Sequence, residues 1–374
     1  MLAFNNNATP LTLGIEIEVQ LLDPETLDLT PVATELFKIT EGCAKIKPEI
    51  FLSMAEITTG ICHDAHEAEK DLGESMNVLK SAAKELNILL STTGTHPFAK
   101  YSERIPYPSE RYAYLMERNQ WIARRIMIYG LHVHLGMKDG DSCISFNNFL
   151  LCFLPHLLAL TSSSPFWQGQ DTGLASSRST IFESCPTAGH PCRVENWQEF
   201  SDLCAHMVQT KSIGSHKDLW WDIRPSPEFG TLEIRICDGL SNLSEALEIA
   251  ALIHTLAHWY AAGNGGDLDT KAPAMWMMRE NKWRALRHGL EADIIPYNDM
   301  KLSPVRHEIT EWLDRIAPYG KKLGYEKYLA GIHETLAKGA SYSRQRKVFE
   351  KAGSIKEVAL HNATEFDTNQ KIYL

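Results

Sequence analysis

The sequence predicts an α+β protein in which a sheet with one apolar and one polar face is backed by helices on its apolar side. Three observations support this prediction. Several short segments alternate apolar and charged residues, which is the pattern of strands whose two faces meet different environments. Longer segments repeat apolar residues every three or four positions, as amphipathic helices do, and they dominate the chain after residue 240. No P-loop, G-x-G-x-x-G or G-x-S-x-G motif points to another nucleotide-binding or hydrolase fold.

The first predicted strand, residues 11–22, contains Glu16 and Glu18 at alternate positions. Side chains two residues apart in a strand share one face, so these two carboxylates stand together. The opposite face of the strand carries the apolar side chains of Ile15, Ile17 and Val19. The polar face of this strand therefore requires a cationic partner.

Five further segments are predicted strands, at residues 48–59, 91–97, 131–135, 220–224 and 231–238. Four of them, at residues 48–59, 131–135, 220–224 and 231–238, carry charged or imidazole side chains among apolar ones. Those polar residues are Glu49 and Glu56, His132 and His134, Asp222 and Arg224, and Glu233 and Arg235. For any one strand, a half-exposed sheet with a charged wet face is the alternative interpretation.

Helices are predicted where the apolar period is close to 3.6, with Asp64 and Ser109 as N-caps of the first two. Their ranges are 65–90, 109–129, 145–162, 195–209, 243–262, 274–292, 303–316, 325–337 and 355–364. Residues 164–191 are rich in Gly, Ser, Thr and Pro, and we expect a long loop there. A loop of that length in a compact domain is usually functional or disordered.

Composition excludes several classes of protein. The 374 residues are 44% hydrophobic and 22% charged, as in an ordinary globular protein, and the net charge of -10 argues against a nucleic-acid-binding surface. No apolar run approaches the roughly 18 residues that span a bilayer, and residues 1–10 lack the features of a secretory signal. Eight cysteines without a C-x-x-C pair fit reduced thiols. We therefore expect a cytoplasmic protein with neither nucleic acid nor membrane as partner.

The carboxylates predicted on the polar face of the sheet would repel one another if they lie close together. Two carboxylates about 4 Å apart repel by roughly 4 kcal/mol at an effective dielectric near 20, and a fold retains only about 5–15 kcal/mol of net stability. If the glutamates converge, divalent cations are the simplest compensation. Oxygen ligands with one imidazole suit Mg²⁺ or Mn²⁺ better than Zn²⁺ or Cu²⁺. Arg224 and Arg235 would complete such a site, since a guanidinium binds phosphate or carboxylate in a forked geometry.

Seven sequence blocks together resemble the carboxylate–amine ligases of the glutamate–cysteine ligase type 2 family. The blocks extend over about residues 14–293, and their joint order is much more specific than any one of them. They are 14–18 (GIEIE), 94–98 (GTHPF), 130–136 (GLHVHLG), 164–173 (SPFWQGQDTG), 222–226 (DIRPS), 230–235 (GTLEIR) and 280–285 (ENKWRA).

The resemblance implies a glutamine-synthetase-like fold, in which a curved antiparallel sheet forms an open funnel with helices outside. It also implies a reaction in which ATP phosphorylates a substrate carboxylate and an amine then displaces phosphate. By similarity, Mg²⁺ would be held by Glu16, Glu18, Glu49, Glu56, His132 and Glu233. Arg235 would contact phosphate, and His132 is preferred to His134 because it matches the family's Gly-x-His pattern.

Three further residues are weaker candidates. Arg178, in the predicted loop, could close over nucleotide or substrate and so join Glu233, Arg235 and Arg224 in the catalytic set; a surface arginine is the alternative. Asn281 and Arg284 lie one turn apart on a predicted helix and could reach the nucleotide. A solvated helix face is the alternative for that pair.

We expect one catalytic domain over residues 1–374, with a sheet-rich core at about 11–240 and a helical part at about 241–374. Its substrates would be ATP, a glutamate-like carboxylate and an amino acid or amine, with cysteine as the default acceptor. The chain could assemble as a homodimer. The alternative function is that of a same-fold metal-dependent hydrolase, or of a non-catalytic protein that binds glutamate or nucleotide, because a fold does not fix a function.

Overall fold

A seven-stranded antiparallel sheet is the centre of the computed structural model, which describes residues 2–7, 9–265, 274–296 and 300–374. The order of the strands is β10-β11-β5-β1-β3-β2, and β4 pairs with the far end of β1. Their bounds are β1 Leu13–Leu22, β2 Ile46–Pro48, β3 Met54–Thr58, β4 Leu89–Ser91, β5 Leu131–Gly136, β10 Ile223–Ser226 and β11 Thr231–Ile234. Three two-stranded pairs lie outside this sheet: β6 (Phe166–Trp167) with β7 (Gln170–Asp171), β8 (Ala188–Gly189) with β9 (Trp220–Trp221), and β12 (Asp293–Ile294) with β13 (Ser303–Pro304).

Fourteen α-helices surround the sheet in the described part of the chain. The first eight are α1 Ala33–Ile39, α2 Ala65–Glu85, α3 Glu110–Asn119, α4 Trp121–Arg124, α5 Gly140–Leu150, α6 Leu154–Thr161, α7 Ser177–Glu183 and α8 Trp197–Gln209. The others are α9 Leu243–Trp259, α10 Met275–His288, α11 Val305–Leu323, α12 Glu326–Lys338, α13 Ser341–Ala352 and α14 Ile355–Thr368.

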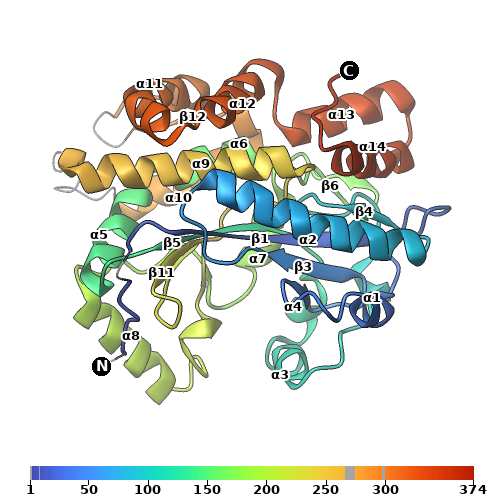
Figure 1. Ribbon diagram of the computed structural model, residues 1–374, viewed down its shortest axis with the longest axis horizontal. Coiled ribbons are helices and arrows are strands. Elements are labelled where there is room, and N and C mark those ends of the chain that lie inside the picture. Colours follow the sequence, from blue (N-terminus) through green and yellow to red (C-terminus); the bar gives the residue numbers. More distant parts are fainter. Residues whose placement is uncertain (1, 8, 266–273, 297–299) are drawn as a thin grey trace.

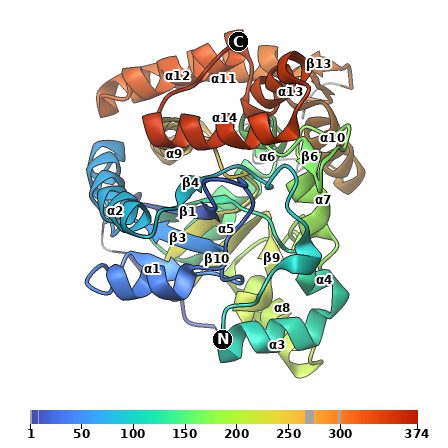
Figure 2. The same cartoon turned by 90° about the vertical axis from the view of Figure 1, so that its right-hand side faces the viewer.

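The helices are unequally divided between the two faces of the sheet. Helices α9 and α2 lie along one face, with α11 and α12 in a further layer beyond them (Figure 1). Helices α3 and α8 stand on the other side, and the side view places the N-terminus near them and the C-terminus near α11 to α13 (Figure 2). The apolar face is therefore covered by α9 and α2, whereas α3 and α8 lie on the side of the polar face.

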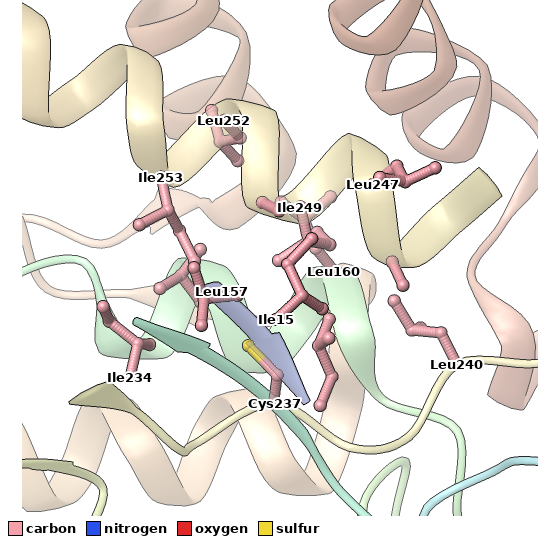
Figure 3. Packing of buried hydrophobic residues seen from close by; sticks show 14 of the residues in the cluster. Ile15, Leu157, Leu160, Ile234, Cys237, Leu240, Leu247, Ile249, Leu252 and Ile253 are labelled. Atoms are coloured by element: carbon pink, nitrogen blue, oxygen red, sulfur yellow. The ribbon is translucent and has the colours of Figure 1, made fainter. Parts of the chain in front are cut away.

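The apolar face holds the main core. Side chains at alternate positions of β1, β5 and β11 are almost fully buried, and they pack against α9 and α6. Figure 3 shows Ile15 and Ile234 of the sheet facing Ile249 and Ile253 of α9, with Leu157 of α6 between them. Because the side-chain period of a strand is two, this burial fixes which residues point to the opposite, polar face.

Among the described residues, no single helix is both long and apolar enough to cross a bilayer. Helices α5 and α6 meet that criterion only when taken together, and they are bent by 65° with respect to each other.

The α+β class and the open antiparallel sheet are confirmed, but several predicted boundaries are wrong. Residues 48–59 form a turn and the strand β3 after β2, not one strand, and the strand predicted at 231–238 ends at Ile234. The helix predicted at 109–129 is broken at Gln120, whose φ of 47° is left-handed. The one predicted at 145–162 is divided into α5 and α6, with Pro155 in the first turn of α6.

The loop predicted at residues 164–191 is also wrong. It contains β6, β7, α7 and β8, and Ser176 caps α7 by accepting a hydrogen bond from the Ser179 amide. Helices α1 and α13 were not predicted at all.

Candidate active site

The register of the sheet places acidic and imidazole side chains opposite one another on its polar face. Glu18 on β1 is paired with Glu56 on β3, and Glu16 on β1 is paired with His132 on β5. On the other side of β5, His134 is paired with Glu233 on β11. Directly paired residues have their Cβ atoms about 5 Å apart, so three strand junctions bring charged groups into contact.

These side chains form three overlapping groups whose candidate ligand atoms lie within 4.8 Å of one another. The first consists of Glu16, Glu56 and His132; it shares Glu16 with the second group and Glu56 with the third. The second and third are Glu16, His134 and Glu233, and Glu18, Glu49 and Glu56. All six predicted ligands are therefore brought together, and His134, to which the family pattern prefers His132, joins them.

The metal-free groups repel one another strongly. Burial, followed by the charge of Glu18, raises the pKa of Glu49 to about 8. Burial and the charges of Glu16 and Glu49 hold the pKa of Glu56 well above its ordinary value. Glu49 thus retains its proton at neutral pH in the absence of a cation, the shift of Glu56 is in the same direction, and a bound cation would favour loss of these protons.

Glu16 behaves differently because it lies between two imidazoles. Burial favours its neutral form, but hydrogen bonds from His132 and His134, together with the charge of His134, outweigh burial and lower its pKa. Its Oε2 lies 3.2 Å from Nδ1 of His132, and its Oε1 lies 3.4 Å from Nε2 of His134. Glu16 is therefore ionised and positioned by both histidines.

His132 supports the fit of a cation to this face. Its Nε2 is buried and has no hydrogen-bond partner, while Nδ1 faces Glu16. Burial and the nearby charge of Arg235 lower the pKa of this histidine. A neutral imidazole that donates from Nδ1 to a carboxylate and exposes the lone pair of Nε2 is a common metal ligand. The donor set of carboxylates with imidazole nitrogen fits Mg²⁺ or Mn²⁺.

Glu233 is neutralised from two sides. Its Oε2 accepts a hydrogen bond of 2.8 Å from Nε of Arg224, which is opposite it on β10, and its Oε1 contacts Nη1 of Arg235. Although burial opposes ionisation, Arg235 and Arg224 lower the pKa of Glu233 below its usual range. The two predicted arginines thus lie at the edge of the acidic groups.

Arg178 is a buried residue of α7, so the alternative of a surface arginine is wrong. Its guanidinium donates to the backbone oxygens of Arg235 at 3.3 Å and Ile236 at 3.4 Å. A Cβ at position 130 would clash with Nη2 of Arg178 and approach His132 Nε2 to 2.9 Å. Gly130 therefore allows Arg178 and His132 to come close together behind the acidic face.

Asn281 and Arg284 are not among the residues brought to the acidic face. Asn281 exchanges two hydrogen bonds of 2.8 Å with the backbone of Ile295. Arg284 pairs with Glu280 at 2.7 Å and donates to the backbone oxygen of Asp293. Both side chains connect α10 to the segment at β12.

Lys282, between Asn281 and Arg284, was missed. It is buried, and its Nζ lies 2.6 Å from Oδ2 of Asp222, next to β10. The signal in the sequence is Asp222 itself, a carboxylate on a predicted strand, whose cationic partner lies on a helix about 60 residues away.

An open pocket of about 370 Å³ adjoins Glu16 and His134 at one end of the polar face. Its lining includes two apolar side chains that are exposed, Ile61 at 82% and Phe229 at 67%. The ring of Phe229 lies 6.2 Å from the ring of His134, edge to face. Volumes in this range accommodate small organic ligands, and neither apolar residue is among those predicted from the sequence.

The model of "Glutamate-cysteine ligase family 2" matches residues 12–361. The chain belongs to glutamate–cysteine ligase family 2. A relative from Bdellovibrio bacteriovorus, named "Putative glutamate--cysteine ligase 2", is 48% identical over 93% of this chain and 92% of its own length. A relative of the same name from Gloeobacter violaceus is 41% identical over 94% of this chain and 95% of its own. Membership of this family makes the chain a carboxylate–amine ligase with small-molecule substrates.

Two solved structures show the fold. The glutamate–cysteine ligase of Francisella tularensis in complex with AMP has a TM-score of 0.69 at 11% identity, covering 97% of this chain and 90% of that one. The bifunctional glutathione synthetase of Pasteurella multocida has a TM-score of 0.70 at 15% identity, and this chain covers 52% of its length. The glutamine-synthetase-like fold implied by the sequence is confirmed.

Proposed function

We propose that this protein is an ATP-dependent ligase that joins the γ-carboxylate of glutamate to an amine through an acyl phosphate. The observation that carries the proposal is the set of three overlapping acidic groups, bordered by Arg224 and Arg235, on one face of the sheet. Residues 1–374 would act as one catalytic domain, since the candidate site is built within a single chain. An ATP-dependent reaction fits the cytoplasm, where we expect it to occur.

The proposed cofactor is Mg²⁺, with Mn²⁺ as a substitute. Its ligands would be Glu16, Glu18, Glu49, Glu56, His132 and Glu233, with His134 available beside Glu16. Bound there, the ion would supply positive charge against the phosphate oxygens of ATP. No residue needs to act as a covalent nucleophile, because phosphoryl transfer depends mostly on positioning and on charge.

The arginines would position the transferred phosphoryl group. Arg235 is held beside Glu233 and would contact the phosphate as charge moves to it. Arg224 is fixed by the backbone oxygens of Lys217 and Leu219, both at 2.9 Å, so its guanidinium keeps one orientation. Arg178 would hold Arg235 in position through its hydrogen bond to the backbone oxygen of that residue.

The pocket beside His134 suggests how the substrates would be oriented in the site. Its two exposed apolar side chains, Ile61 and Phe229, suit the flat base of ATP, because aromatic and aliphatic surfaces bind a base by stacking and burial. The phosphates would then extend over Glu16 and His134. Glutamate and the acceptor amine would approach from the end of the sheet that carries Glu18 and Glu49.

A coupled ADP assay tests the proposal, with Mg²⁺ and glutamate against a panel of amino acids and amines, and with mass spectrometry of the product. We expect ADP release that requires both glutamate and an amine, with cysteine as the default acceptor. ADP release without an amine would favour a hydrolase, and binding without release would favour a non-catalytic protein. An acceptor preferred to cysteine by about tenfold, or about 1.4 kcal/mol, would change the substrate and leave the reaction class intact.

A further inference from the structure

Lys282 forms a buried ion cluster outside the acidic face. Its side chain is 2% exposed, and its Nζ contacts both Asp222 Oδ2, at 2.6 Å, and Oε1 of Glu183. The attraction of the two carboxylates outweighs burial and raises the pKa of Lys282, so the ammonium is charged. Neither Asp222 nor Glu183 belongs to the three acidic groups of the described residues, so this ion cluster is separate from the proposed cation site.

The cluster joins α10 to two elements that carry or hold the arginines of the site. Glu183 is the last residue of α7, whose second residue is Arg178. Asp222 precedes β10, which carries Arg224, and its backbone oxygen accepts a hydrogen bond of 2.8 Å from the amide of Arg235. Lys282 comes from α10, on neither of these segments.

Backbone hydrogen bonds form a second connection between the same elements. Nη2 of Arg178 donates to the backbone oxygen of Arg235, and the amide of Asp222 donates to the oxygen of Gly189 at 2.8 Å, in the strand that follows α7. The backbone of Arg235 is thus held between Asp222 and Arg178, and Lys282 links the elements that supply both.

We propose that Lys282 is a positioning residue for the ligase reaction, whose ammonium holds Asp222 and Glu183 together so that Arg235 and Arg178 keep their places beside the acidic face. The inference rests on the proposed function, since that function gives Arg235 its contact with phosphate. Stability alone does not require such a cluster, because apolar replacements of buried ion pairs are often neutral or stabilising. A displacement of about 1 Å in a catalytic group can cost a hundredfold in rate.

The test compares Lys282→Met with Lys371→Met. Lys371 makes a similar buried pair, 2.7 Å from Glu248, and also donates to Thr335 in the C-terminal helical layer. Both variants should melt at a lower temperature. We expect Lys282→Met to lower kcat by about 10- to 100-fold with KM for ATP changed by less than about threefold, and Lys371→Met to leave kcat within about twofold.

A kcat for Lys282→Met within about twofold of the unchanged protein, measured well below its melting temperature, would overturn the inference, as would an equal loss in both variants. If Lys282→Met does not fold, Glu183→Gln removes the more exposed anchor and should lower kcat in the same direction; unchanged kcat would again overturn the inference. A crystal structure of Lys282→Met gives a readout independent of turnover. Displaced Arg235 and Arg178 guanidinium groups are expected, and unmoved ones contradict the inference even if the ligase proposal itself has failed.

Discussion

Replacement of Glu233 by Gln tests the acidic face where it meets the arginines. Glu233 is almost fully buried and is the shared partner of Arg224 and Arg235. The amide keeps the shape of the side chain and removes its charge. The three-residue cluster then changes from a net charge of +1 to +2, and one proposed cation ligand is lost.

Two losses are expected, and their sizes follow from this geometry. Removal of one preorganised charge partner typically costs a hundred- to a thousandfold in rate, or about 2.7–4 kcal/mol. Breaking a buried ion pair from one side costs about 3–5 kcal/mol of stability, because the remaining charge is left unpaired. A fold of about 5–15 kcal/mol can tolerate that loss at low temperature, so the variant should be folded and nearly inactive.

The assay is ADP release at 15–20 °C, or about 288–293 K, with thermal unfolding of each variant as a check of folding. Glu365→Gln is the matched control, since Glu365 is also fully buried and pairs with Arg344 at 2.7 Å, far along the chain in α14. The control should lose a similar amount of stability and keep its rate within about twofold. Activity of a folded Glu233→Gln within a few-fold of the unchanged protein would refute the assignment of Glu233.

Three further predictions concern the same face. Because the pKa of Glu49 is raised to about 8 in the folded, metal-free protein, its contribution to stability decreases as pH rises from about 4.5 to about 8; Mg²⁺ should therefore raise the melting temperature more at pH 8 than at pH 6, and an equal rise at both would contradict the assignment. Phe229→Ala should raise KM for ATP with kcat nearly unchanged, as steady-state kinetics would show, whereas a lower kcat at unchanged KM would argue against base binding there. Gly130→Ala should lower kcat by forcing Arg178 and His132 apart, and full activity would contradict the close approach.

The polar face could be predicted from the sequence because strand alternation is a local property. Ile15 and Ile17 must be buried, so Glu16 and Glu18 must face the other way. The contacts between strands are not local. That Glu18 meets Glu56 depends on the register of β1 against β3, which many side chains set together.

Residues outside regular strands were harder to place. Glu49 follows β2 in a turn, where alternation gives no information, and not in the strand predicted at residues 48–59. The family's Gly-x-His pattern prefers His132 to His134, yet the pairing of His134 with Glu233 brings it to Glu16. On α10, the helical period does not predict which partners the polar side chains contact. Asn281 forms hydrogen bonds with the backbone of Ile295, and Lys282 forms an ion pair with Asp222.

The most direct test of the ligase account is the transfer of oxygen from glutamate to phosphate. In the proposed reaction an oxygen of the γ-carboxylate attacks the γ-phosphorus of ATP and ADP leaves; the amine then attacks the acyl carbon, and phosphate leaves with that oxygen. With glutamate labelled by ¹⁸O in its γ-carboxylate, mass spectrometry of the inorganic phosphate should show one ¹⁸O atom per phosphate, in equal amount to the amide product. Phosphate without the label, formed in unlabelled water at the same rate as ADP, would show hydrolysis of ATP and contradict the account.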